Sequence, residues 1–273
     1  MLRLESATGW WLTTHPDHAR LAAAFAEHWG NDLFTTPEPR AQVLKGIAVH
    51  DDGWAARDAT PQITRQGKPS AFSTELVGKY SAFEEIDLAD YLAVRDRAVR
   101  LVAEQDAYAA LLVSMHTYNL LTERADRSTI VPEQLPLLDS FLAGQKSLQQ
   151  RLLGRLQDDP GLAPEEKSRM RIEDNFRLLQ ATDNLSLLSC VNYDKAATLL
   201  HPLRLKDGGT ATVAVEALGE RIFRLAPYPL DVSPLTVEFP ARHVAWKVFA
   251  EAEWLQERYA EAEVEKLSVT ITE

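Results

Sequence analysis

The sequence predicts an α+β protein that is mostly α, with a small antiparallel sheet packed on a helical bundle. Apolar residues recur at helical spacing through most of residues 16–191. After Lys206 the chain alternates between polar and apolar residues and contains glycine turns, a pattern typical of antiparallel strands. We therefore expect residues 1–205 to form the bundle with an N-terminal strand, and residues 206–273 to add strands and one helix.

Local signals place the elements in chain order. Residues 1–14 alternate around Gly9 and predict a strand or short hairpin that joins the C-terminal strands. Pro16 and Asp17 favour the first turn of a helix, which Gly30-Asn31 ends. The same apolar spacing predicts further helices over residues 37–51, 87–104, 106–122, 134–157 and 164–191. Strands are expected over residues 210–218, 221–225, 235–239 and 266–272, with one helix over 247–261.

Composition excludes several classes of protein. The 45% hydrophobic content is enough for a sizeable core, and the net charge of -11 argues against nucleic-acid and anionic-membrane binding. The N-terminus lacks signal-peptide features, and no apolar run reaches the roughly 18 residues of a membrane span, so we expect a cytoplasmic protein. Cys190 is the single cysteine, which excludes an internal disulfide and suits a small buried thiol.

Residues of metal-ligand type interrupt the apolar faces of four separate helices. They are His18, the doublet His50-Asp51, His116 and Asp183. A buried charge needs a partner or a metal, so these intrusions predict one shared site. Each residue alone has a simpler explanation, because a lone histidine is often satisfied within the core. Asp183 could likewise pair with Arg171 or Arg177.

Imidazole and carboxylate ligands without thiolate suit Mn, Fe, Zn, Ni or Co, which the sequence does not distinguish. We expect one divalent transition metal on His18, His50, Asp51 and Asp183, and no second metal. Such a metal can turn bound water into a nucleophile near neutral pH.

Neighbouring residues supply candidate catalytic and substrate-binding groups. His116 would act as an acid, base or hydrogen-bond donor, and Asp52 would orient a water or a ring. Asp52 could equally be a turn aspartate. The irregular residues 55–85 would close over the substrate. Weaker substrate-binding candidates are Trp54, Lys68, Tyr118 and Asn119, although Trp54 also suits the core and Lys68 a solvated loop.

The ligand order resembles that of the HD-domain superfamily of metal-dependent phosphohydrolases. Segments HDDGW (50–54) and LLQATDNLSLL (178–188) look like its doublet and final-aspartate motifs. This resemblance implies an HD-like bundle and hydrolysis of a phosphorylated small molecule or nucleotide. Over about residues 1–245 the chain is similar to the DUF3891 family, which has no assigned activity, through the segments TTHPDHARLAAAFAEHWG, AVHDDGW, LLVSMHTYNL and LLQATDNLSLLSC.

Two departures from the superfamily pattern keep other functions open. Gly53 and Trp54 follow the doublet where HD hydrolases often have a lysine, and only His116 is available for a second metal. The alternatives are a non-enzymatic metal- or ligand-binding module and an HD-like di-iron oxygenase. The expected partner is a small molecule, and a homo-oligomer is left open. The sequence contains no GxGxxG, Walker-type, GxSxG or HExxH motif.

Overall fold

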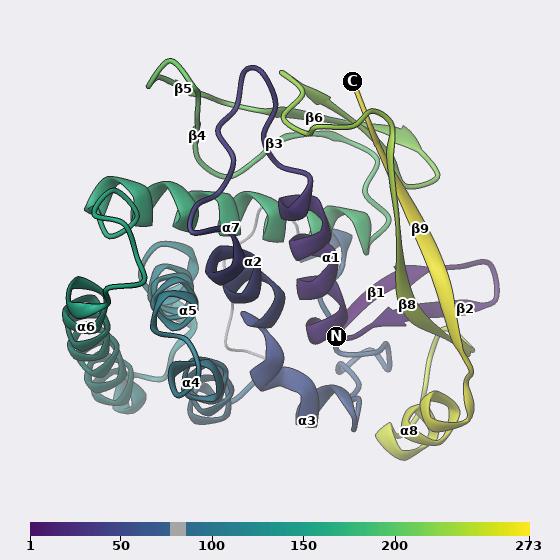
Figure 1. Cartoon of the computed structure of the whole chain (residues 1–273). Coiled ribbons are helices and arrows are strands. Elements are labelled where there is room, and N and C mark those ends of the chain that lie inside the picture. The colour runs from purple at the N-terminus through teal and green to yellow at the C-terminus, as the bar shows by residue number, and fades with distance from the viewer. Residues whose placement is uncertain (77–85) are drawn as a thin grey trace.

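The computed structural model describes residues 1–76 and 86–273. Helices α1, α5 and α7 carry His18, His116 and Asp183, and His50-Asp51 directly follow α2. Helix α1 packs on α2 and α7, and α2 packs on α5 (Figure 1). The α-helices are α1 (His15–Glu27), α2 (Arg40–Val49), α3 (Ala55–Asp58), α4 (Leu88–Ala103), α5 (Ala107–Asn119), α6 (Leu135–Asp158), α7 (Arg169–Ser189) and α8 (Ala252–Glu261).

Seven of the described strands form one sheet in the order β1-β2-β8-β9-β7-β6-β3, which curls around one side of the helices (Figure 1). A separate pair, β4 and β5, makes a two-stranded sheet. The strands are β1 (Leu2–Glu5), β2 (Gly9–Thr13), β3 (Ala196–Thr198), β4 (Leu203–Arg204), β5 (Thr210–Ala211), β6 (Ala214–Gly219), β7 (Ile222–Ala226), β8 (Leu235–Ala245) and β9 (Val264–Thr272).

The prediction of a mostly helical, HD-like bundle with a small sheet is therefore wrong. Helix makes up about 48% of the structure and strand about 21%, and the sheet is a curled half-barrel. The long strands β8 and β9 pair at eight positions, from Leu235–Ile271 to Arg242–Val264. The sequence placed the end of β8 at residue 239 because Pro240, Arg242 and His243 interrupt the apolar alternation there.

The pairing of the sheet also differs from the expected purely antiparallel arrangement. Strand β9 lies between β8, to which it is antiparallel, and β7, to which it is parallel. The N-terminal hairpin joins the same sheet through β2, which pairs with β8. The largest apolar cluster accordingly includes Leu2 from the hairpin, Phe25 from α1 and Ile271 from β9.

The described part of residues 55–85 is tied to its surroundings by backbone hydrogen bonds. Arg3 N donates to Phe72 O at 2.8 Å, and Phe249 N donates to Gly67 O at 2.8 Å. Residues 77–85 of the predicted lid lie outside the described residues. The closing role of this segment stays a prediction.

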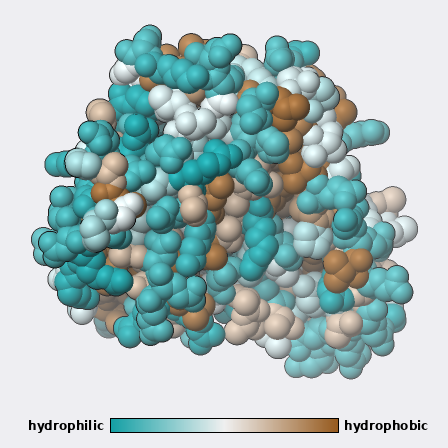
Figure 2. All heavy atoms as spheres, viewed as in Figure 1, coloured by the Kyte–Doolittle hydropathy of each residue, from teal (hydrophilic) through white to brown (hydrophobic). Residues whose placement is uncertain are grey.

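Among the described residues, no helix combines the length and apolar character that a bilayer crossing requires. The face in Figure 2 is mostly hydrophilic, and its apolar residues form only small groups. Large apolar side chains are instead concentrated in the core, as Tyr108, Phe25 and Phe34 illustrate.

Gly53 allows the turn after the doublet to approach the backbone of α4. A Cβ at this position would lie 2.1 Å from Val94 O and 2.9 Å from Ala98 N. We expect Gly53→Ala to lower the free energy of unfolding by about 1–3 kcal/mol, because backbone atoms must move apart. Urea denaturation measures this loss.

Gly144→Ala is the matched control, because no atom within 4 Å would meet its Cβ in α6. That variant should gain about 0.5–1 kcal/mol, since alanine is the better helix former. Equal effects at the two positions would contradict the close approach of Gly53 to α4.

Candidate metal centre

The structure brings the four predicted ligands and His116 together in the interior. One group of mutually close ligand atoms comes from His18, His50 and Asp51, and a second from His50, His116 and Asp183. Within each group these atoms lie within 4.8 Å of one another. His18 and His50 are 0% exposed and Asp183 is 7% exposed, so the Asp183 side is the more accessible.

The hydrogen bonds of His50 determine which of its ring nitrogens is free. His50 Nδ1 lies 2.7 Å from Ile47 O, and a carbonyl can only accept, so Nδ1 carries the hydrogen. In a neutral ring the buried Nε2 is then a lone pair, whereas in a protonated ring Nε2 is a donor that faces Asp183. It lies 3.3 Å from Asp183 Oδ1 and 3.8 Å from Asp51 Oδ2.

His18 reaches the same arrangement through Ser186. The Ser186 hydroxyl donates its one hydrogen to Asp183 O at 2.8 Å, so its Oγ accepts from His18 Nδ1 at 2.9 Å. His18 Nε2, the other ring nitrogen, lies 3.1 Å from Asp51 Oδ2. Ser186 is a site residue that the sequence analysis missed.

The Nε2 atoms of two imidazoles thus face carboxylate oxygens of Asp51 and Asp183. Lone pairs facing anions repel unless a proton or a metal cation lies between them. Burial alone would lower the pKa of His50, but Asp51 and Asp183 raise that pKa to about 9. Without a metal, His50 is therefore protonated at neutral pH. Neutral imidazoles held by second hydrogen bonds, together with carboxylates, are a donor set that fits a transition metal.

Arg95 is a charged partner of Asp51 that the sequence analysis did not predict. Its Nη1 donates to Asp51 Oδ1, and its Nε donates to Tyr91 Oη at 3.2 Å. Burial alone would raise the pKa of Asp51, but Arg95 and His50 hold it well below its usual range. The signal was present in the sequence, because Arg95 interrupts the apolar face of α4 between Leu92 and Val99.

His116 lies beside His50, with 5.0 Å between the two ring centroids. Burial lowers the pKa of His116 to about 3, although Asp183 acts in the opposite direction. Its buried Nδ1 has no hydrogen-bond partner, so the neutral ring can still gain a ligand or a donor. The predicted catalytic role of His116 stays a prediction, and the geometry also suits a fifth metal ligand.

Asp52 and Trp54 lie next to the cluster without belonging to the two ligand groups. Asp52 Oδ1 is 3.3 Å from Arg20 Nη1, and burial raises the pKa of this half-buried carboxyl. Trp54 stacks on His15 with ring centroids 4.4 Å apart and packs beneath the Arg95 guanidinium. Trp54 therefore helps to hold the arginine that pairs with Asp51.

The remaining weak candidates separate in space. Lys68 lies over the Trp10 ring at 6.0 Å, in the region where the hairpin meets α8. Tyr118 lies beneath Lys146, with 5.2 Å from Nζ to the ring centroid. Asn119 is linked to α7, because its Oδ1 accepts a hydrogen bond from Gln180 Nε2 at 2.7 Å.

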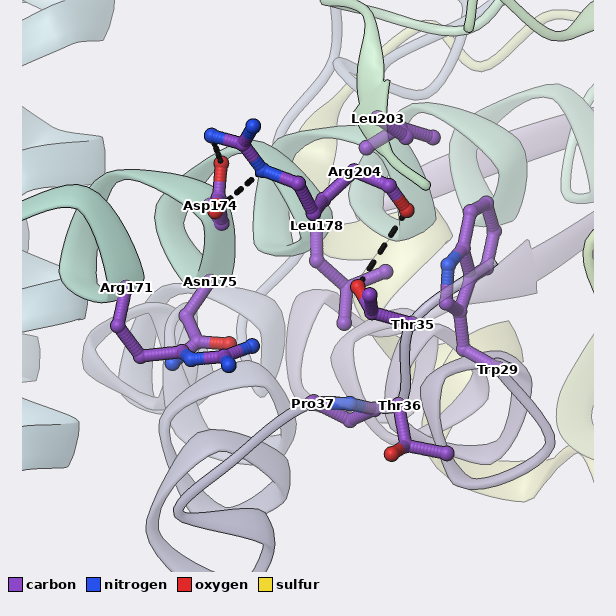
Figure 3. Close-up of a pocket in the computed structure, with 10 residues that line it drawn as sticks. All are labelled: Trp29, Thr35, Thr36, Pro37, Arg171, Asp174, Asn175, Leu178, Leu203 and Arg204. Atoms are coloured by element: carbon purple, nitrogen blue, oxygen red, sulfur yellow. Dashed lines mark hydrogen bonds and ion pairs between the residues drawn. The ribbon is translucent and has the colours of Figure 1, made fainter. Parts of the chain in front are cut away.

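A small pocket elsewhere in the structure is lined by Arg171, one of the two candidate partners of Asp183. Figure 3 shows Arg171 beside Asn175, while Arg204 reaches across to Asp174. The cavity volume is about 20 Å³, enough for roughly one water molecule and too small for a substrate. The contacts of Asp183 are instead with His50 and His18.

A family model described as "Protein of unknown function (DUF3891)" matches residues 1–245. The chain belongs to the DUF3891 family. No curated protein and no solved structure matches it. All five clustered His and Asp residues of this DUF3891 member lie inside the matched region, whereas α8 and β9 follow it. The family assignment carries no activity, so function rests on the chemistry of the site.

Proposed function

We propose that His18, His50, Asp51 and Asp183 bind one divalent transition metal. The observation that carries this proposal is that two buried imidazole Nε2 atoms face the Asp51 and Asp183 carboxylates. Ile47 O and Ser186 Oγ hold the two rings in that orientation. Both ligand groups share His50, and one Nε2 lone pair coordinates one ion, which favours a single metal over a di-iron pair.

We further propose that the protein is a metal-dependent phosphohydrolase acting on a phosphorylated small molecule or nucleotide. A metal held by nitrogen and oxygen ligands supplies an activated water and positive charge for the phosphoryl oxygens. Asp183 forms the more exposed side of the cluster, so substrate would approach there. Arg95 keeps Asp51 ionised, and His116 offers a neutral ring nitrogen beside His50 for positioning the water or the phosphate.

The test combines elemental metal content with a phosphoester screen. We expect about one transition metal per chain and turnover of at least one phosphoester in the metal-loaded protein. Asp183→Asn should lose the metal and lower turnover at least about 100-fold. Asp174→Asn is the matched control on the same helix, because Asp174 pairs with Arg204 and not with the cluster. Circular dichroism checks that each variant is folded.

Other outcomes separate the alternatives. One bound metal without turnover of any phosphoester would favour a non-enzymatic module, in which the metal stabilises the fold. Two irons per chain with an oxygen-dependent absorbance change would favour an oxygenase. A wild-type protein that binds no metal after addition of Mn, Fe, Zn, Ni or Co would refute the metal site itself.

A further inference from the structure

Polar side chains lead from the cluster toward the surface along two neighbouring helices. His116 and Asn119 lie three residues apart on α5, and Asp183 and Gln180 lie three residues apart on α7. Residues at this spacing share one helix face. Gln180 Nε2 donates to Asn119 Oδ1 at 2.7 Å, which joins the two helices one turn outward from His116 and Asp183.

His201 continues this path at the surface. Its Nε2 donates to Gln180 Oε1, and its ring centroid lies 6.3 Å from that of Phe176. The residue is exposed and has a φ of 64°, a left-handed conformation that is strained for a non-glycine residue. Tertiary contacts therefore hold an imidazole at the outer end of the path.

Two arginines lie one helical turn from the polar residues of this path. Arg177 lies one turn before Gln180 on α7, and Arg124 ends the π-helical turn Leu120–Arg124 that follows Asn119. A π turn links residues five apart, so Arg124 lies one turn beyond Asn119. Burial and then these two guanidinium groups lower the pKa of His201, which is consistent with their lying close to it.

In the part of the chain that the structure describes, neither Arg124 nor Arg177 forms an ion pair with a carboxylate. The protein as a whole carries a formal net charge of -11, so two unpaired guanidinium groups beside a histidine stand out. Guanidinium groups match the oxygens of phosphate, and the Asn119 side-chain amide adds further donors.

We infer that Arg124, Arg177 and His201 form an anion-binding site at the mouth of the cluster, where they hold a second phosphate group of the substrate. At 1.5 Å per residue, Arg177 lies about 9 Å along α7 from Asp183, a span that suits a small molecule with phosphates at both ends. The assignment to substrate rests on the proposed function, whereas anion binding at this site does not.

The test is calorimetric titration of metal-free protein with inorganic phosphate and pyrophosphate at low ionic strength, where charge attraction is least screened. We expect wild type to bind and the double variant Arg124→Gln/Arg177→Gln to bind at least about tenfold more weakly. Arg171→Gln, on the same helix but lining the pocket of Figure 3, should bind like wild type. Glutamine keeps helix propensity, and circular dichroism checks the fold of both proteins.

Asp183→Asn separates failure of this inference from failure of the proposed function. It should keep phosphate binding, because the anion site does not need the metal ligands. If Asp183→Asn loses binding and the arginine double variant keeps it, phosphate occupies the cluster and the inference is overturned. No binding by wild type, or an equal loss in Arg171→Gln, also overturns it, and neither result bears on the metal.

Discussion

Metal added to chelator-treated protein should raise its melting temperature by about 8–16 °C. Free metal at a thousandfold excess over the dissociation constant stabilises the folded state by about 4 kcal/mol. For a chain of 273 residues, each kcal/mol corresponds to roughly 2–4 °C. The physical reason is that the ion offsets the negative charge of the buried Asp51 and Asp183 carboxylates, which lie beside His18 and His50. Differential scanning calorimetry with and without metal measures the shift.

The stabilisation of the protein by added metal should increase as the pH rises. The pKa of His50 is raised to about 9 from an ordinary 6.5, so its proton stabilises the metal-free fold fully below pH 6.5. That contribution is lost as the pH rises through about 9. A metal must displace this proton to bind, so its stabilising effect should be smaller at pH 6 than at pH 9. A shift that is absent in wild type, or equally large in Asp183→Asn, would contradict the ligand set.

Arg95→Met should lower the free energy of unfolding of metal-free protein by about 3–5 kcal/mol. The substitution removes the cation next to Asp51 and leaves a buried carboxylate without its strongest partner. Methionine keeps much of the packing against Trp54 and Tyr91, so the loss reports mainly on charge. Bound metal should recover part of this loss, because it offsets the same negative charge. Urea denaturation with and without metal measures both values.

Arg204→Met is the matched control for Arg95→Met. Arg204 also pairs with an aspartate, Asp174, but its side chain is 21% exposed against 8% for Arg95. Water screens the more exposed pair, so we expect a loss of at most about 1 kcal/mol. Similar losses in the two variants, or a loss in Arg95→Met that metal leaves unchanged, would show that Arg95 does not balance the cluster.

Local periodicity predicted the helices that build the site. The segment from Pro16 to Trp29 reads as one helix, and α1 spans His15–Glu27. The spacing of Leu112, His116 and Leu120 likewise predicted the helix that becomes α5. Helix periodicity is a property of a few neighbouring residues, so a single sequence suffices to read it.

The histidines and aspartates of the centre could be predicted from the sequence, but Arg95 and Ser186 were not predicted. The sequence singled out the four predicted ligands because each is polar on an apolar face, and the same rule would have found Arg95 on α4. Ser186 carries no such signal, since a serine on a helix commonly bonds its own backbone. Its role depends on lying opposite His18, 168 positions away in the chain.

By itself, the sequence determined which side chains are chemically able to hold a metal and that they lie on, or at the end of, the apolar face of a helix. Only the tertiary structure decided that those faces meet and that Arg95 balances Asp51. It also decided that β9 inserts between β7 and β8, which makes a seven-stranded sheet from segments at both ends of the chain. The physical reason is that residue spacing records local geometry, whereas strand partners and buried charge pairs depend on contacts between distant segments.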